Sequence, residues 1–267
     1  MSGSGISPQV TLPPFTMKER PFFHGVCDSF LPRDLYAQLS ANFPKHPSKV
    51  GVDGFSLFAD DAAYQALLRE YPCWSRLYEI THSQYFVDYC AAEFMTACIE
   101  KLCKIDIDGA TLSDYLEERA SKSEASLKAG DHHPTDLFVR TDIIQGSEGF
   151  PRLPHTDHRR RLVTILLYCC DAVDDELAGG DLVLHAADLT RSPAVSFTPA
   201  HNRAVGFACS NEAWHSLSPV RARDRPGRFV QITLSSLFDV WPSPGPVERL
   251  KHYVGDRLLR RMYVGAA

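Results

Sequence analysis

Two histidines and one aspartate in the second half of the chain have the types and spacing of metal ligands. His155 and Asp157 are separated by one residue, and His215 lies 60 positions (215 − 155) after His155. Two imidazoles and one carboxylate can hold Fe(II) on one face and leave positions open for a cosubstrate and dioxygen. In a strand, residues i and i+2 point to the same side, so we expect His155 and Asp157 to reach one ion together. The sequence therefore predicts an iron centre that is also the catalytic centre.

A purely structural role for these residues is the alternative. The chain has 11 histidines, so a His-x-Asp pair can occur without a metal, as hydrogen-bonded residues near a strand end. The segment after His215 favours the metal site, because the arginine-rich stretch RARDRPGR leads into the strand-like run FVQITL. A dicarboxylate cosubstrate needs a permanent cation for its remote carboxylate, and arginine offers one with a bidentate fork.

The elements that would position these residues lie between about 137 and 240. Short apolar runs recur there, separated by Gly, Pro, Asn and Asp. Seven or eight short strands of this kind predict a sandwich or jelly roll. The sequence has no Gly-rich phosphate loop, which argues against a dinucleotide-binding fold. The runs are LFVRTDIIQ, RLVTILLYCC, GGDLVLHAA, AVSFTP, RAVGFACS, AWHSLSPV and RFVQITLSSLF.

The first half of the chain is predicted to be mainly helical. Apolar residues recur at helical spacing between 32 and 43, between 60 and 80, and most clearly between 83 and 102. We expect a flexible leader at 1–20, a polar loop within 107–136 and a last helix at about 247–263. The predicted fold is α+β in one domain from residue 21: a mainly helical part at 21–136, a β core at 137–240 and a C-terminal helix within 241–267.

Composition excludes several classes of function. A net charge of −5 and a pI of about 6.1 argue against a general binder of nucleic acid or membrane surfaces. No apolar stretch approaches the roughly 20 residues of a membrane span, and the N-terminus lacks the pattern of a secretory signal. The eight cysteines show no C-x-x-C spacing, which favours a reduced, cytoplasmic protein. The oligomeric state stays open, a homodimer included.

Several of these segments resemble one known family. The C-terminal half is similar to the prolyl-4-hydroxylase-like branch of the Fe(II)- and 2-oxoglutarate-dependent oxygenases. The opening PFFHGVCDSFLPRDLYAQLSANFP is similar to the N-terminal stretch of bacterial members. The likeness covers about 21–45 and 137–240. The segments that carry it in the second half are HTD at 155–157, LVTILLY at 162–168, GGDLVLH at 179–185, HSLSPV at 215–220 and RFVQITL at 228–234.

The resemblance implies a double-stranded β-helix, a jelly-roll or cupin-like barrel, with iron at one end. It implies Fe(II) and 2-oxoglutarate as cofactors, with dioxygen as cosubstrate. The cation for the cosubstrate in such proteins follows the second histidine by nine or ten positions. Arg225 lies ten positions after His215 and Arg228 thirteen. We expect Arg228, since it immediately precedes the strand, with Arg225 as the alternative and Arg221 and Arg223 as surface charges.

Asp157 bears on the type of reaction that the resemblance implies. Related halogenases have a small residue in place of this carboxylate, which leaves a position on the metal for chloride. Because Asp157 is present, hydroxylation or another oxidation is expected. Desaturation and ring closure remain possible outcomes of the same chemistry.

Further residues are candidates for the pocket. Arg140 and Asp142 alternate with apolar neighbours and could hold a polar substrate, although an exposed strand face explains them equally well. Thr164 could donate to a carboxylate of the cosubstrate or simply be buried. Arg160 could meet an anionic substrate at the pocket mouth or belong to a solvated edge, and Trp214 could form the pocket wall or only pack.

Three functions are consistent with these features. The expected one is an enzyme that oxidises a small molecule, such as an amino acid or a natural-product intermediate, with succinate and carbon dioxide as coproducts. A protein or peptidyl hydroxylase of the same family is the first alternative. A non-catalytic cupin-like binding or sensing protein is the second, and the complete ligand set argues against it.

Overall fold

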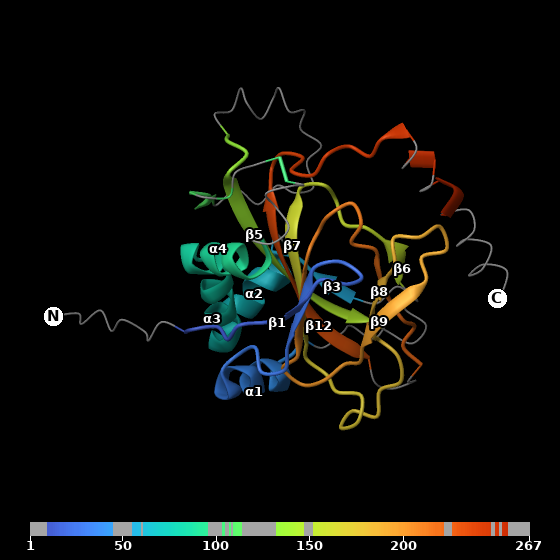
Figure 1. The fold of residues 1–267 in the computed structure, drawn as a ribbon. Coiled ribbons are helices and arrows are strands. Elements are labelled where there is room, and N and C mark those ends of the chain that lie inside the picture. Colours follow the sequence, from blue (N-terminus) through green and yellow to red (C-terminus); the bar gives the residue numbers. More distant parts are fainter. Residues whose placement is uncertain are drawn as a thin grey trace.

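The fold consists of two β-sheets that face each other and a group of helices on the outer face of the larger sheet (Figure 1). The computed structural model describes residues 10–44, 55–59, 61–95, 103–104, 107, 109–113, 132–146, 152–221, 226–246, 249–250 and 253–255. Within these residues, no helix combines the length and the apolar character that crossing a membrane requires.

The larger sheet has eight strands, seven of which follow the order β1-β2-β10-β7-β12-β5-β3. The eighth, β4, pairs in parallel with β5, and every other pairing is antiparallel. β5, β7 and β12 are buried along almost their whole length, so they form the centre of the fold. The strands are β1 (Thr16–Lys18), β2 (His24–Cys27), β3 (Phe55–Leu57), β4 (Thr111–Leu112), β5 (Asp136–Gly146), β7 (Arg161–Tyr168), β10 (Ala204–Ala208) and β12 (Gly227–Ser236).

The smaller sheet has the order β6-β11-β8-β9. Its strands are β6 (Arg152–His155), β8 (Leu182–His185), β9 (Pro193–Phe197) and β11 (His215–Leu217). Along the chain, β5 to β12 pass repeatedly from one sheet to the other, which is consistent with a jelly roll. The predicted sheet-rich α+β plan is confirmed. A closed barrel is not, because within the described residues neither strand order returns to its first strand.

The helices pack on the face of the larger sheet that points away from the smaller one. α3 begins with Pro72 at its first position, where a missing N–H is harmless. Ser83 caps α4, since its hydroxyl accepts from the backbone N–H of Phe86 at 3.2 Å. The predicted helix at 83–102 is α4 followed by one π-helical turn, and 96–102 lie outside the described residues. The elements are α1 (Arg33–Ala41), α2 (Ala62–Glu70), α3 (Pro72–Thr81), α4 (Gln84–Cys90) and the π-helix η1 (Ala91–Met95).

Two apolar cores follow from this layering. One lies between the helices and the larger sheet and includes Leu77, Phe94, Leu167 and Ile232. The other lies between the two sheets and includes Phe207. Burial of these side chains is the main favourable contribution to folding, and it fixes which face of each strand points toward the space between the sheets.

The N-terminal segment differs from its predicted description as a leader. Residues 10–20 are part of the fold: β1 pairs with β2, and Leu12 and Phe15 are buried. Leu12 and Phe15 pack into the helix-side core, which outweighs the loop-like appearance of the neighbouring prolines and serines. Residues 1–9 lie outside the described part of the chain.

Other predicted segments are only partly described. Most of the polar loop at 107–136 lies outside the described residues, and β4 occupies its start. Helical residues occur at 246, 249–250 and 253–255, within the predicted C-terminal helix. The division into parts at 21–136, 137–240 and 241–267 stays a prediction.

Candidate metal centre

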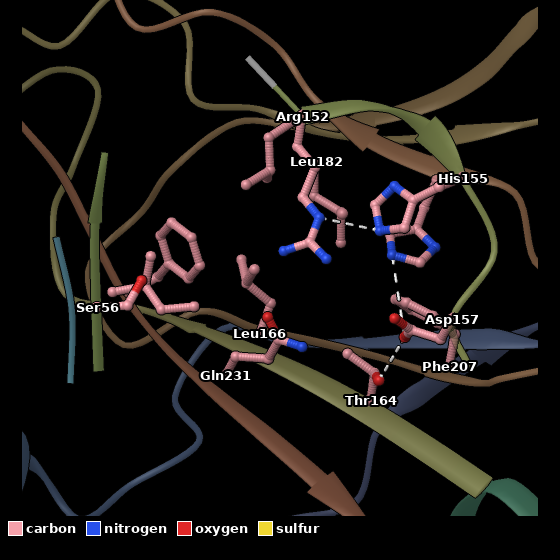
Figure 2. Close-up of a pocket in the computed structure, with 13 residues that line it drawn as sticks. Ser56, Arg152, His155, Asp157, Thr164, Leu166, Leu182, Phe207 and Gln231 are labelled. Carbon is pink, nitrogen blue, oxygen red and sulfur yellow. Dashed lines mark hydrogen bonds and ion pairs between the residues drawn. The ribbon is translucent and has the colours of Figure 1, made fainter. Parts of the chain in front are cut away.

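His155, Asp157 and His215 lie together at one wall of a pocket between the two sheets (Figure 2). One ligand atom of each residue lies within 4.8 Å of the other two. The Nε2 atom of His215 is 4.0 Å from Oδ2 of Asp157, and the two imidazole rings are 4.3 Å apart between centroids. The three residues that the sequence selected are therefore brought to one point, in an arrangement that fits a single metal ion.

Strand pairing positions the two histidines. His155 is the last residue of β6 and His215 the first of β11, and the two are register partners. Asp157 lies outside the strand, in the connection to β7. The sequence predicts that strand alternation places Asp157 beside His155. This explanation is wrong, because Asp157 is not in a strand. Side-chain bonds to β7 hold it instead.

The carboxylate of Asp157 is fixed through both of its oxygens. Arg161 donates from Nη1 to Oδ1 at 2.9 Å, and Thr164 donates from Oγ1 to Oδ2 at 2.7 Å. The thiol of Cys209 lies 3.5 Å from Oδ2. Burial alone would raise the pKa of Asp157, but Arg161, His215 and the Thr164 hydroxyl outweigh it and lower that pKa. Asp157 is therefore an oriented anion, as a metal ligand must be.

Both imidazoles present Nε2 to the site. Nδ1 of His155 lies 2.8 Å from the carbonyl of Leu153, and Nδ1 of His215 lies 3.0 Å from that of Ala213. A carbonyl only accepts, so Nδ1 carries the proton and Nε2 has the free lone pair. Burial, helped by His215 and Arg152, lowers the pKa of His155 to about 4. Burial also lowers the pKa of His215. Both rings are thus neutral near pH 7 and able to bind a metal.

The pocket beside the triad encloses a cavity of about 60 Å³ and opens to solvent. Most of its wall is apolar. Beyond the triad and Thr164, the polar side chains that line it are Arg152, Gln231 and Ser56. Its apolar wall consists of Ile144, Leu166, Leu182, Phe207, Leu217 and Phe229.

The predicted cosubstrate residues lie in different places. Thr164 lines the pocket, but its hydroxyl donates to Asp157. Arg228 does not line it: Phe229 and Gln231 face the pocket, and Arg228 lies between Gly227 and Phe229 on β12 with the opposite orientation. Its guanidinium lies 3.6 Å from a carboxylate oxygen of Asp175 and 5.7 Å from the ring centroid of Phe43. The placement thus does not support its predicted role. Arg225 lies outside the described residues.

The predicted substrate residues divide into two pairs. Arg140 and Asp142 are buried on β5, where their register partners on β12 are Thr233 and Gln231. They therefore lie on the pocket side of the larger sheet, although they are not among the lining residues.

The other two predicted substrate residues lie elsewhere. Arg160 lies 3.9 Å from a carboxylate oxygen of Asp239, and Trp214 lies beneath the Arg191 guanidinium at 3.7 Å. Neither lines the pocket. Trp214 is buried, so the alternative of packing alone fits it.

Sequence reasoning missed Arg152, Arg161, Gln231 and Ser56. The pairing of β6 with β11 contains a bulge: His215 pairs with His155 and Leu217 with Arg152, so three steps on β6 match two on β11. The extra residue turns Arg152 to the same pocket as His155, which simple alternation forbids. For Arg161, its position four residues after Asp157 in an arginine run was the available signal.

A family model matches the part of the chain that forms the site. Residues 141–233, which run from β5 to β12 and contain all three ligands, match the family model described as 2OG-Fe(II) oxygenase superfamily. This match agrees with the resemblance seen in the sequence and covers the segment that carries the site. The protein is thus a 2-oxoglutarate-dependent non-haem iron dioxygenase, and the predicted cofactors Fe(II) and 2-oxoglutarate, with dioxygen, are confirmed. The non-catalytic alternative is therefore set aside.

Solved structures of distant oxygenases are similar to this chain. A prolyl 4-hydroxylase structure from Phytophthora capsici has a TM-score of 0.49 and 18% identity over 89% of this chain and 72% of that one. A 2OG-Fe(II) oxygenase family oxidoreductase from Burkholderia pseudomallei has a TM-score of 0.49 and 13% identity over 82% of this chain and 86% of that one. A Pseudomonas putida prolyl-4-hydroxylase has a TM-score of 0.47 and 15% identity over 80% of this chain and 93% of that one. No curated protein matches the sequence.

Proposed function

We propose that this oxygenase hydroxylates a C–H bond of a small molecule, such as a free amino acid or a natural-product intermediate, with succinate and carbon dioxide as coproducts. The observation that carries the proposal is the set of three ligand atoms within 4.8 Å of one another at the wall of a largely apolar pocket. Iron bound there would supply the oxidising chemistry. The side chains of the protein orient the reactants and exclude water.

The carboxylate of Asp157 supports hydroxylation over halogenation. A ligand set with an aspartate leaves no metal position for a halide in place of the carboxylate. Arg161 and Thr164 keep this carboxylate ionised and in one orientation. The apolar wall, which includes Leu166 and Phe207, limits access of water to the reacting atoms.

Buried charged side chains on the pocket side of the larger sheet support a small polar substrate. Nη2 of Arg140 and Oδ2 of Asp142 form an ion pair at 2.9 Å, with both residues buried on the pocket side of β5. A buried pair of opposite charges can bind the carboxylate and the ammonium group of one zwitterion. Arg140 and Asp142 are therefore the proposed substrate anchors, whereas the positions of Arg160 and Trp214 do not support that role.

Turnover assays with matched substrates test the proposal. The purified protein is incubated in air with Fe(II), 2-oxoglutarate and either free amino acids or short peptides that contain the same residues. Succinate and the product mass are measured together. We expect one added oxygen atom on a free small molecule and one succinate per product. The variant Asp157→Ala, which lacks the carboxylate ligand, should form neither.

The alternative, a peptidyl hydroxylase, predicts the opposite preference. Oxygen added to the peptides but not to the free acids would overturn the small-molecule proposal and leave the oxygenase intact. Chlorine in the product, in chloride buffer, would overturn the hydroxylase assignment.

A further inference from the structure

Arg152 is the one cation among the described residues that line the metal pocket. Figure 2 shows its guanidinium directed into the pocket beside His155. Its Nε donates to Nε2 of His155 at 3.0 Å. The β6–β11 bulge places it there, at the start of the strand that ends with the first metal ligand.

The bonding of Arg152 differs from that of the other arginines around the site. Arg161 is paired with Asp157, Arg140 with Asp142, and Arg228 with Asp175. In the described part of the chain, no carboxylate lies within ion-pair distance of Arg152, and its bonded partner is the imidazole of His155. Arg152 is exposed, so a ligand that enters the pocket can reach its guanidinium. A guanidinium without a carboxylate partner can form a charge-assisted contact with an anionic ligand.

The hydrogen bond to His155 cannot persist beside a bound metal. Nδ1 of His155 is occupied by the carbonyl of Leu153, so Nε2 holds the one lone pair that the ring can offer. A metal and the Arg152 N–H compete for that lone pair. With Nε2 of His155 bound to a metal, the guanidinium of Arg152 would have its five N–H donors available to a ligand in the pocket.

We propose that Arg152 binds the far carboxylate of 2-oxoglutarate. The cation that selects this dicarboxylate would then come from the strand of the first metal ligand, and not from the segment after the second histidine. This inference rests on the proposed function. A 2-oxo acid that reaches the metal with one end must place its second carboxylate in the same pocket, where the other polar lining groups, Gln231 and Ser56, are uncharged. A guanidinium offers that carboxylate a two-pronged, charge-assisted contact.

Binding of two 2-oxo acids tests the inference. The Fe(II) protein is titrated without oxygen with 2-oxoglutarate and with 2-oxopentanoate, which has the same carbon chain but lacks the far carboxylate. The visible charge-transfer band reports each affinity. Arg152→Met should weaken the binding of 2-oxoglutarate roughly 10- to 100-fold, as expected for a lost hydrogen bond to a charged group. The affinity for 2-oxopentanoate should stay unchanged. Arg152→Lys should retain part of the preference. Arg228→Met, a matched change outside the pocket, should behave as the wild type does.

Two controls separate this effect from damage to the site. Melting temperature and Fe(II) affinity are measured without any acid. Because Arg152→Met frees the lone pair of His155, this variant should bind Fe(II) at least as tightly as the wild type. If Arg152→Met still prefers 2-oxoglutarate to 2-oxopentanoate, or if Arg225→Met loses that preference instead, the inference is wrong. The proposed function would stand in either case. If the wild type with bound iron gives no band with either acid, the proposed function fails and the inference with it.

Discussion

The two faces of the larger sheet have different compositions although the same strands form both. In the middle of β7 and β12, the face toward the helices consists of apolar side chains, which belong to one core. The face toward the smaller sheet mixes apolar residues with Thr164, Gln231 and Thr233. The helix-side residues are Val163, Ile165, Leu167, Val230, Ile232 and Leu234.

This difference indicates that one face of the sheet mainly stabilises the fold and the other mainly forms the functional site. The helix side gains stability from uninterrupted apolar burial. The pocket side holds buried groups that stability alone would not select, such as the Thr233 hydroxyl, which has no hydrogen-bond partner. A buried hydroxyl without a partner is destabilising by roughly 1–3 kcal/mol. Exceptions of this kind are expected next to a functional site.

The largest expected effect comes from removing a ligand on the pocket side. His215→Ala should weaken Fe(II) binding by more than roughly 100-fold, the upper end of effects seen for groups that only support ligands. Melting temperature should change little, because the substitution leaves the helix-side core intact. Competition with a chelator measures the affinity. Retained Fe(II) binding would remove His215 from the site.

Adjacent leucines of β7 test the division between the faces. Leu167 is fully buried toward the helices, and Leu166 lines the pocket. Leu167→Ala should lower the free energy of unfolding by about 2–5 kcal/mol and leave the KM for 2-oxoglutarate unchanged. Leu166→Ala should raise that KM as well as destabilise the protein. Urea denaturation and steady-state kinetics supply both values, and a raised KM in Leu167→Ala would contradict the division.

Arg161 should affect the metal more than the fold. Arg161→Met removes the partner of Asp157 Oδ1, and we expect Fe(II) affinity to fall by about 10- to 100-fold. Arg159→Met, two positions away and paired with Asp239, is the control and should leave the affinity unchanged. Equal losses in both variants would mean that general positive charge, and not the contact with Asp157, is responsible.

Thr164 should give the smallest effect. Thr164→Val keeps the shape of the side chain but removes the bond to Oδ2 of Asp157. Fe(II) affinity should fall by no more than about 10-fold, at the low end for groups that orient a ligand, while Thr164→Ser should retain it. If Thr164→Ser binds Fe(II) as weakly as Thr164→Val does, the hydroxyl does not determine the Fe(II) affinity.

The sequence predicted those parts of the site that depend only on residue type and on spacing along the chain. The ligands were recognisable by residue type and spacing, and the strands by apolar runs between turn residues. Arg152 could not be found, because its direction depends on a bulge between two strands that are distant in sequence. The orientation of Arg228 depends in the same way on the register of β12 against β5 and β7.

The boundaries of the fold show the same limit. Residues 10–18 look like a loop by composition, and pairing with β2 makes part of them a strand. Asp157 has the spacing of a strand residue, yet contacts with Arg161 and Thr164 determine its place. Tertiary contacts decide in each of these cases, and local sequence does not encode them.

The most direct test of the metal centre is an anaerobic titration with Fe(II) and 2-oxoglutarate. We predict a weak visible charge-transfer band that requires both components and that is lost in His155→Ala and in His215→Ala. A band that persists in these variants, or no band in the wild-type protein with iron bound, would contradict the assignment of His155, Asp157 and His215 as the iron centre of a 2-oxoglutarate oxygenase.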